Sequence, residues 1–303
     1  MDNKICVVVV TYNRKELLLR NIHATLSQTV PVDILVFDNH SSDGTRDYLS
    51  EHGILDLPGV HYIYSAANLG GAGGFCEGMK KAYEMGFEFA WLMDDDGYCY
   101  DTKTLENLLN SVPENQNAFI LNPTVICDDK HTLTFGFLDI GTYSQLKEKA
   151  VGNVYDGYIN PFNGTLISRK CIEEIGFPMG QFFIYGDEHE YMLRAQKNDI
   201  LLRTVVDSLY FHPVNRRIEY RQVWKYDIPL KDEPVWKTFC DIRNNIYITR
   251  HYSGWKMLLV KVFVSISAAM LKKEKKMTYL KYTLIAILDG LRENFNRPIM
   301  FNK

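Results

Sequence analysis

The sequence predicts an α/β protein in which helices flank a Rossmann-like sheet and a helical extension follows at the C-terminus. Three observations lead to this prediction. Strand-like and helical segments alternate from the N-terminus, polar loops follow the strands, and the pattern from Asp241 onward is helical. Alternation of strand and helix is typical of βαβ units, whose ligands bind at the carboxyl ends of the strands. We therefore expect the functional residues where strands end.

Length and composition limit the class of protein. The 303 residues allow a main domain at 1–239 and a helical, basic C-terminal region at 240–303. The hydrophobic fraction of 46% indicates a sizeable core, and the net charge of −3 gives no reason to propose a nucleic-acid partner. The six cysteines lie far apart, which suits reduced thiols in a cytosolic compartment, and we see no secretory signal.

Apolar runs and helical spacing place the elements in order along the chain. The expected strands are rich in β-branched or aromatic residues, which suits strands buried on both faces of a sheet. They cover residues 5–10, 32–37, 60–65, 87–93, 118–127, 163–168 and 182–184. The expected helices cover residues 15–28, 45–51, 102–110, 170–175 and a segment from 187. Residues 128–157 give no clear prediction.

Three consecutive carboxylates, Asp94, Asp95 and Asp96, follow the aromatic strand at 87–93. In an extended chain Asp94 and Asp96 project to one side and Asp95 to the other. Carboxylates side by side at the end of a buried strand repel each other and are costly to desolvate. A hard divalent cation such as Mg²⁺ or Mn²⁺ removes that cost and usually also binds substrate phosphates. The alternative is a solvated acidic turn, but the position after the fourth strand favours a metal site.

A glycine-rich segment, Asn68–Phe75, follows the third strand and leads into a helix. Glycines allow close backbone approach, and a helix start offers free N–H groups to an anion. We therefore expect a loop that brings a nucleotide-sugar close to the main chain. A dinucleotide-binding fingerprint fits badly, because its third glycine would fall at Cys76 and the segment does not follow the first strand. A flexible linker is the third interpretation.

A second acidic focus lies at 187–190, where Asp187, Glu188 and Glu190 open a helix. Acids in a first helical turn can simply complement the helix dipole. A carboxylate crowded by others also suits a general base near neutral pH. His212 follows a further short strand. A single histidine is usually structural, but one at a strand end is a candidate third metal ligand.

The C-terminal region combines an apolar helix face with positive charge. Apolar residues recur at three- and four-residue intervals from Trp255 to Met270, although the run is too short and too charged for a clear membrane span. Between 256 and 281, seven lysines stand against the single acid Glu274, a local net charge of +6. This pattern can seat a helix at an anionic membrane surface. Helices that cover the main domain or contact a second subunit explain it equally well.

Taken together, these stretches resemble the family 2 inverting glycosyltransferases of the GT-A fold. The stretches that carry the resemblance are Val7–Arg14, Phe37–Thr45, Asp94–Asp96, Asn163–Thr165 and Gly186–Arg194. The resemblance covers roughly the first two thirds of the chain and implies a GT-A catalytic domain with a mixed sheet. Its motifs are specific as an ordered set, although no single one is.

The resemblance also implies roles for individual residues. Glu188 is the expected catalytic base, with Asp187 as the alternative because the family more often has Asp at that position. Asp94, Asp96 and His212 would hold Mn²⁺ or Mg²⁺. The residues expected around the nucleotide sugar are Thr11, Asn13, Arg14, Asp38, Asn68, Gly70, Gly71, Gly73, Gly74 and Asp95. Those expected on the acceptor side are Asn163, Gly164 and Glu190.

Within the family, the glycine-rich segment and the three acids are similar to those of bacterial galactofuranosyltransferases. This implies transfer of galactofuranose from UDP-galactofuranose to a lipid-linked or oligosaccharide acceptor in surface polysaccharide synthesis. A glycine wall without side chains would admit the exocyclic arm of a furanose. The alternatives are a rhamnosyltransferase using dTDP-rhamnose and a non-catalytic sugar-nucleotide or glycan-binding protein. We expect a cytoplasmic protein, peripheral at the inner face of the plasma membrane, with a homo-oligomer left open.

Overall fold

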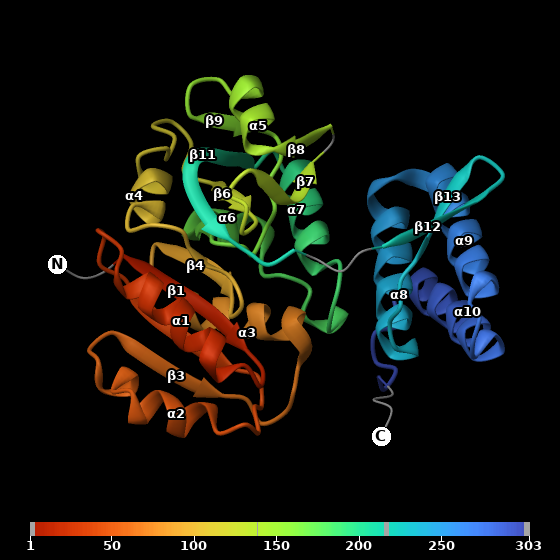
Figure 1. Cartoon of the computed structure of the whole chain (residues 1–303), viewed down its shortest axis with the longest axis horizontal. Helices are drawn as coiled ribbons and strands as arrows, with labels where there is room; N and C mark the ends of the chain where they lie inside the picture. The colour runs from red at the N-terminus through yellow and green to blue at the C-terminus, as the bar shows by residue number, and fades with distance from the viewer. Residues whose placement is uncertain (1–3, 138, 215–217, 300–303) are drawn as a thin grey trace. The chain divides into compact units, whose positions relative to one another are not determined.

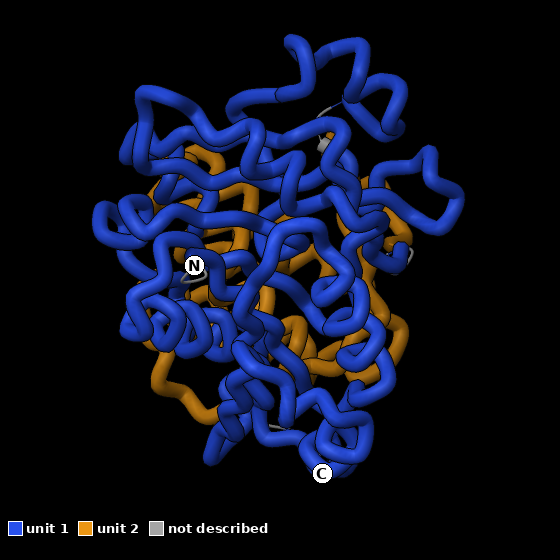
Figure 2. Tube along the Cα trace, turned by 90° about the vertical axis from the view of Figure 1, so that its left-hand side faces the viewer, with its two compact units in different colours: residues 1–180, 191–215 blue, residues 181–190, 216–303 orange. Residues whose placement is uncertain are grey.

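The computed structural model describes residues 4–137, 139–214 and 218–299 (Figure 1). The chain forms two compact units, coloured separately in Figure 2. The first contains residues 1–180 and 191–215, and the second contains residues 181–190 and 216–303. Positions 1 and 303, the outer ends of the two expected domains, lie outside the described residues. The functional division after residue 239 stays a prediction.

The first unit is built on a mixed sheet, as the sequence predicts. Its strands follow the spatial order β3-β2-β1-β4-β10-β6-β11-β5. They are β1 (Ile5–Thr11), β2 (Asp33–Asp38), β3 (Val60–Tyr64), β4 (Phe89–Asp94), β5 (Tyr98–Cys99), β6 (Phe119–Ile126), β10 (Thr165–Ser168) and β11 (Leu201–Phe211). The sheet is parallel from β3 to β4, whereas β10 runs antiparallel to both of its neighbours.

Helices cover both faces of this sheet because its central strands are apolar on both sides. Val7 and Val9 of β1 pack under α1 (Lys15–Leu26), α2 (Thr45–Glu51) and α4 (Thr104–Leu109). Val8 and Val10 pack on the other face, where α3 (Gly70–Glu84), α6 (Arg169–Ile175) and residues from 191 onward in α7 (Asp187–Lys197) lie. The continuous β-branched run at the N-terminus therefore forms a strand buried on both sides.

The strand register brings polar residues together at one edge of the sheet. Thr11 pairs with Asp38 across β1 and β2, and Val10 pairs with Asp94 across β1 and β4. Asp38 also pairs with Tyr64 of β3. Because these strands are parallel, their carboxyl ends lie side by side, and Thr11, Asp38 and Asp94 share one edge.

Residues 128–157, which gave no clear prediction, form an excursion beside the sheet. Its elements are β7 (Thr132–Phe137), β8 (Ile140–Thr142), α5 (Tyr143–Lys149) and β9 (Val154–Asp156). The strand expected at 182–184 is wrong, because Phe182 ends a short 3-10 turn, Gly180–Phe182, and residues 183–184 are irregular. Another 3-10 turn covers Ile54–Asp56.

The second unit packs three long helices beside a hairpin. Its elements are β12 (Glu219–Val223), β13 (Tyr226–Leu230), α8 (Val235–Tyr252), α9 (Gly254–Leu271) and α10 (Lys276–Arg292). The first of these helices begins at Val235, before the expected start at Asp241. Its buried Arg243 and Asn244 donate hydrogen bonds to the carbonyls of Phe182, Ile184 and Tyr185. These bonds satisfy backbone carbonyls of a segment without regular secondary structure.

The glycine-rich segment is the first part of helix α3, not the expected loop. A Cβ atom on Gly73 would lie 2.5 Å from the Leu69 Cβ atom, and one on Gly74 would lie 2.5 Å from the Val10 Cγ1 atom. A Cβ on Gly78 would lie 2.5 Å from the Val8 Cγ1 atom, whereas one on Gly71 would meet nothing within 4 Å. Gly74 and Gly78 therefore let α3 approach β1 closely, and Gly73 makes room for Leu69. Gly73 and Gly74 do not form an open wall.

We expect Gly78→Ala to lower the free energy of unfolding by about 1–3 kcal/mol, because the added methyl group overfills a packed helix–strand contact. Gly71→Ala is the matched control on the same helix. It has open space, and the better helix propensity of alanine should leave stability unchanged or raise it by up to about 1 kcal/mol. Urea unfolding of both variants measures the difference. Equal stabilities would contradict the packing explanation of the glycines.

Candidate functional site

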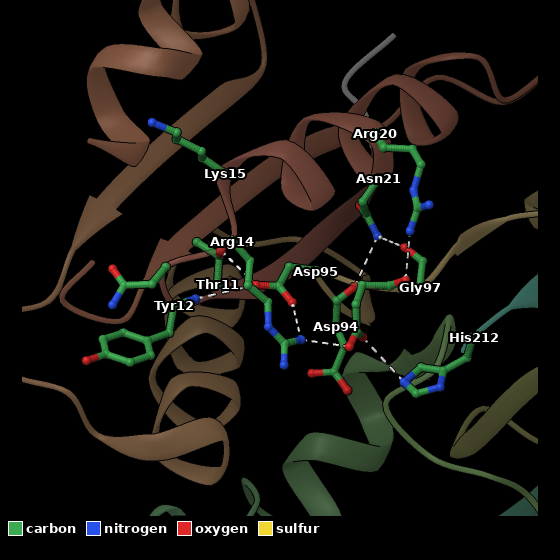
Figure 3. Close-up of polar contacts among 12 residues, drawn as sticks. Thr11, Tyr12, Arg14, Lys15, Arg20, Asn21, Asp94, Asp95, Gly97 and His212 are labelled. Atoms are coloured by element: carbon green, nitrogen blue, oxygen red, sulfur yellow. Dashed lines mark hydrogen bonds and ion pairs between the residues drawn. The ribbon is translucent and has the colours of Figure 1, made fainter. Parts of the chain in front are cut away.

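The three acids form the turn between β4 and β5, where two of them meet His212 (Figure 3). One ligand atom from each of Asp94, Asp96 and His212 lies within 4.8 Å of the others. The Nε2 atom of His212 is 3.4 Å from the Oδ1 atom of Asp96. Residues separated by more than a hundred positions in the sequence therefore meet in one cluster.

Strand pairing brings His212 to this turn. The short strand β5 follows the acids directly, and its Tyr98 pairs with Phe211 at the end of β11. The backbone N–H of His212 donates to the Ile126 carbonyl at 3.1 Å. The His212 Nδ1 atom lies 2.8 Å from the Pro213 carbonyl oxygen, which can only accept, so Nδ1 carries a proton. The Nε2 atom is thereby left facing the carboxylates.

Charge coupling shifts the pKa of both partners in this pair. Burial alone would raise the pKa of Asp96, but the hydrogen bond and charge of His212, together with Arg14, hold it below its usual range. Burial alone would lower the pKa of His212, but Asp96 and Asp94 raise it above its usual range. Without a bound cation, a protonated His212 therefore neutralises part of the acidic cluster.

The cluster fits a divalent metal ion. Two carboxylates and an imidazole nitrogen are a donor set that suits Mn²⁺ and is compatible with Mg²⁺. The hydrogen bond of His212 to the Pro213 carbonyl orients the ring, as is usual for metal-binding histidines. The Asp94 and Asp96 side chains are half-buried, so a ligand can reach them from solvent.

Asp95 turns away from this cluster and is 4% exposed. Its Oδ2 atom accepts a hydrogen bond of 2.8 Å from the Thr11 hydroxyl. The Nη1 atom of Arg14 lies 3.1 Å from Asp95 Oδ1 and 2.6 Å from Asp96 Oδ2, so one guanidinium bridges two acids (Figure 3). Burial raises the pKa of Asp95 to about 6, although Arg14 and Thr11 favour its ionised form.

Helix α1 supports the backbone of the acidic turn. The buried Asn21 side chain donates to the Gly97 carbonyl at 2.8 Å and to the Asp94 carbonyl at 3.2 Å (Figure 3). The exposed Arg20 donates to the Asp96 carbonyl at 3.1 Å. The sequence analysis did not identify Asn21. Its only signal there is a polar residue beside the apolar positions Leu18 and Ile22 of the same helix.

The buried ring of Tyr210 lies between two glycines and fixes the geometry of the site. A Cβ atom on Gly97 would collide with this ring, lying 2.7 Å from its hydroxyl oxygen. A Cβ on Gly164 would lie 2.8 Å from the ring, and Gly164 has φ of +70°. The glycines after Asp96 and after Asn163 are therefore required by Tyr210, which the sequence analysis also missed.

The residues expected to hold the nucleoside lie at the neighbouring strand ends. Asp38 is buried. It accepts hydrogen bonds from the Ser41 backbone N–H at 2.7 Å and from the Tyr62 hydroxyl. Asn13, with φ of +53°, accepts from the Ser42 backbone N–H at 2.7 Å. These bonds fold the loop after β2 against the loop after β1.

Asparagines fix the start of helix α3. Asn39 donates to the Gly70 carbonyl at 2.8 Å and accepts from the Leu69 backbone N–H at 2.8 Å. Asn68 accepts from the Gly70 backbone N–H at 2.8 Å. Among the expected donor-site glycines, Gly71 is exposed and Gly70, Gly73 and Gly74 are buried.

On the expected acceptor side, Asn163 is buried beside the end of β4. Its Nδ2 atom donates to the Pro161 carbonyl at 3.0 Å. Its Oδ1 atom has no hydrogen-bond partner within the described residues. Because a buried amide oxygen without a partner is costly, this atom is suited to accept a hydrogen bond from a ligand.

The remaining candidate residues open helix α7 within the second unit. Asp187 and Glu190 are buried, whereas Glu188 is half-buried. The Tyr252 hydroxyl donates to Glu190 Oε1 at 2.7 Å. Gly186 precedes them with φ of +88°, and a Cβ there would lie 3.0 Å from the Ile248 Cδ1 atom. Of the three acids, Glu188 is the one with the more accessible side chain.

The sequence matches known proteins over almost its whole length. Residues 6–188 match the family model for glycosyl transferase family 2. Galactofuranosyltransferase GlfT1 of Mycolicibacterium smegmatis is 28% identical over 97% of this chain and 98% of its own length. The dTDP-rhamnosyl transferase RfbF of Shigella flexneri is 26% identical over 96% of this chain and 97% of its own length.

The fold also matches solved glycosyltransferases. GalNAc-T7, crystallised with UDP, GalNAc and Mn²⁺, superimposes with a TM-score of 0.61 over 96% of this chain and 56% of that chain. The sequence identity is 13%, so this likeness concerns the fold alone. Together with the mixed sheet and the helical C-terminal region, it confirms the expected GT-A type fold.

We expect Asn21→Ala to lower the free energy of unfolding by about 1–3 kcal/mol, because two buried carbonyls of the acidic turn lose their donor. Arg20→Ala is the matched control from the same helix. It removes an exposed donor that water can replace, and it should change stability by less than about 0.5 kcal/mol. Urea unfolding compares the two. If the two variants lose the same stability, Asn21 does not support the turn.

Proposed function

Since the chain belongs to glycosyl transferase family 2, we propose that this glycosyltransferase moves galactofuranose from UDP-galactofuranose to a hydroxyl of a glycan acceptor in bacterial surface polysaccharide synthesis. The donor assignment is supported by the likeness to GlfT1 over nearly the full length of both chains. The observation that carries the chemistry is the cluster of Asp94, Asp96 and His212, beside the strand ends at Thr11 and Asp38. Such a cluster suits a diphosphate leaving group.

We assign the metal site to Asp94, Asp96 and His212, with Mn²⁺ or Mg²⁺ as the ion. A bound divalent cation would neutralise the charge that develops on the departing nucleoside diphosphate. Arg14 holds Asp95 and Asp96 in place and keeps the two neighbouring acids from repelling each other. Asp95 accepts a hydrogen bond from the Thr11 hydroxyl, which links the end of β1 to the acidic turn.

The nucleotide sugar is assigned to the loops at this edge. The proposed contacts are Thr11, Asn13, Arg14, Asp38, Asn68, Gly70, Gly71, Gly73, Gly74 and Asp95. Of the glycines, the exposed Gly71 has a main chain that a ligand can reach directly. For Gly73 and Gly74 we expect an indirect role. The missing side chain of Gly74 allows the helix that carries Gly71 to lie close to β1, and that of Gly73 makes room for Leu69.

Glu188 is the proposed general base. It takes the proton from an acceptor hydroxyl, whose oxygen then forms a bond to the anomeric carbon from the face opposite the diphosphate. The bond from the anomeric carbon to the diphosphate breaks in the same displacement, so the configuration inverts and UDP leaves with the electron pair. The half-buried Glu188 suits contact with an acceptor better than the buried Asp187. Asn163, Gly164 and Glu190 are the proposed acceptor-side residues.

We also propose that residues 240–303 lie at the cytoplasmic face of the membrane, where lipid-linked acceptors would be held. Among the described residues, α9 is the one helix that is long and apolar enough to cross a membrane by length and composition, and little of it is buried. Trp255 is 68% exposed and Leu259 is 60% exposed. Exposed apolar residues beside lysines are typical of helices that lie in a membrane interface.

The donor is tested with the full-length protein, a glycan acceptor and Mn²⁺, comparing UDP-galactofuranose with dTDP-rhamnose. We expect a β-galactofuranoside from the first donor and little product from the second. Chelation of the metal should abolish transfer, because the leaving group then loses its charge stabilisation. The likeness to RfbF makes dTDP-rhamnose the alternative donor. Preferential transfer from dTDP-rhamnose would refute UDP-galactofuranose as the donor, but not the membership of glycosyl transferase family 2.

Asp96→Ala provides the control for the metal assignment. This variant should bind Mn²⁺ more weakly and lose transfer while keeping its thermal unfolding transition. Transfer that survives thorough chelation, or an Asp96→Ala protein with native activity, would show that the acidic cluster is not a required metal site.

Replacement of Glu188 by Gln keeps the size of the side chain but removes its ability to accept a proton. We expect kcat to fall by about 10²–10⁴, the usual contribution of a general base, with donor affinity nearly unchanged. Asp187→Asn is the matched comparison on the preceding residue. A large loss of kcat in Asp187→Asn, with near-native turnover in Glu188→Gln, would move the base to Asp187.

Binding to anionic lipid vesicles tests the membrane proposal. Binding should weaken as salt rises from about 0.05 to 0.5 M, because salt screens the lysines. Leu259→Asp should lower the bound fraction, since it places a charge on the exposed apolar side of α9. Leu57→Asp, at a half-exposed leucine of the first unit, is the matched control and should bind normally. Equal sedimentation of both variants would exclude α9 as the membrane contact.

A further inference from the structure

The second unit contains a partly open cavity whose lining combines apolar residues with a group of polar side chains. Its volume is about 80 Å³, and it lies among β13, α8, α9 and α10. The polar residues that line it include Lys231, Thr238, Asp241, Lys261, Lys272 and Thr283. The lining therefore combines three ammonium groups with one carboxylate, an excess of two positive charges.

The single carboxylate of this lining is already engaged. Asp241 accepts from the Lys231 ammonium at 2.9 Å through Oδ2 and from Asn245 at 2.8 Å through Oδ1. The Lys272 ammonium donates to the Lys231 backbone carbonyl. Glu233 lies near Lys231 but is not part of the lining, and it accepts from the Tyr185 hydroxyl at 2.8 Å. Asp241 therefore forms its ion pair with Lys231, and no ion pair of Lys261 or Lys272 is found among the described residues.

Lys261 is the exceptional member of this group. Within the described part of the chain, its ammonium forms no ion pair and no side-chain hydrogen bond. Burial lowers the pKa of Lys261, Asp241 opposes that shift and the neighbouring Lys231 adds to it. A partly buried charge without a partner is costly, so this position favours an anion.

Two hydroxyl groups beside the lysines also lack partners. The Oγ1 atoms of Thr238 and Thr283 are buried without a hydrogen-bond partner among the described residues, and Thr283 is 1% exposed. Native proteins satisfy most buried hydroxyls. Two unsatisfied donors around a cavity with excess positive charge are what an oxyanion would use.

Helix α9 directs its polar side chains into this cavity. Lys261 and Ser265 of α9 line it, whereas Leu259 and Met270 of the same helix are exposed. Apolar residues of α9, among them Val262 and Ile266, also pack against the core of the second unit. The lysine on this inner side of the helix is therefore surrounded by packed apolar residues, where an unpaired charge is costly.

We propose that this cavity binds a phosphate group. The volume equals that of roughly two to three waters, which a phosphate group can occupy. Lys261 and Lys272 would balance its charge, and Thr238 and Thr283 would donate to its oxygens. This site goes beyond the proposed transfer reaction, because none of its residues belongs to the donor, metal or base assignments. The phosphate can come from free inorganic phosphate or from the headgroup of a lipid in contact with α9.

Calorimetric titration of the full-length protein with inorganic phosphate tests this site. A chelator is present throughout, so that phosphate cannot bind through a metal at the acidic turn. We expect Lys261→Gln to weaken binding by about ten-fold or more, because a charge-assisted hydrogen bond is lost. Lys256→Gln, an exposed lysine on the same helix, is the matched control and should bind as the native protein does. Equal phosphate affinity in Lys261→Gln and the native protein would overturn the proposal.

A second variant and a second probe complete the experiment. Thr283→Val keeps the shape of the side chain and should weaken phosphate binding even if Lys261→Gln misfolds. A soluble short-chain phosphatidic acid distinguishes the two sources, since tighter binding than inorganic phosphate assigns the site to a lipid headgroup, and weaker binding assigns it to the free ion. Binding of neither probe to the native protein refutes the site. No donor or acceptor sugar is used, so this result is independent of the transfer assay.

Discussion

The site depends on the mutual repulsion of three consecutive carboxylates at the end of a central strand. Carboxylates this close cannot all stay ionised in a partly buried position unless cations separate and neutralise them. The fold separates and neutralises the three carboxylates on two sides. Asp95 turns to Thr11 and Arg14. Asp94 and Asp96 face His212. The acidic turn therefore depends on the opposite charges of Arg14, between β1 and α1, and of His212, directly after β11.

Neutral groups also hold the turn. Asn21 donates two hydrogen bonds to backbone carbonyls there without adding charge to the cluster. The Tyr210 ring fills the space that side chains at positions 97 and 164 would occupy, so Gly97 and Gly164 both approach it closely. Because Tyr210 lies two residues before His212, one strand positions both the packing that shapes the turn and the imidazole that faces it. Shape and electrostatics at this site are thus set by the same strand.

Most of the fold and part of the site could be predicted from the sequence, because local pattern determines them. A β-branched run with flanking helical spacing specifies the strand containing Val7, whatever lies far away in the chain. The contacts of Asn21 and Tyr210 could not be predicted, since both depend on pairing between segments distant in sequence. The error at Gly73 has a different cause. Glycine suits a loop near a ligand and a crowded helix start equally well, and the contact of Gly73 with the Leu69 side chain becomes visible only in the folded chain.

The lysines of the C-terminal region show why a local net charge does not locate a binding surface by itself. The +6 segment contains both Lys256, which is exposed, and Lys261, which lines a cavity. An exposed lysine acts through long-range attraction that salt screens, whereas a partly buried one acts through short contacts in a lower dielectric. A helix that turns apolar residues outward and a lysine inward can use both effects. In the proposals made above, anionic lipids would attract the outer lysines, and a single phosphate group would match the inner ones. Binding through the exposed lysines should therefore weaken more with added salt than binding through the lysines that line the cavity. This difference follows from burial in the fold and cannot be read from the amino-acid composition.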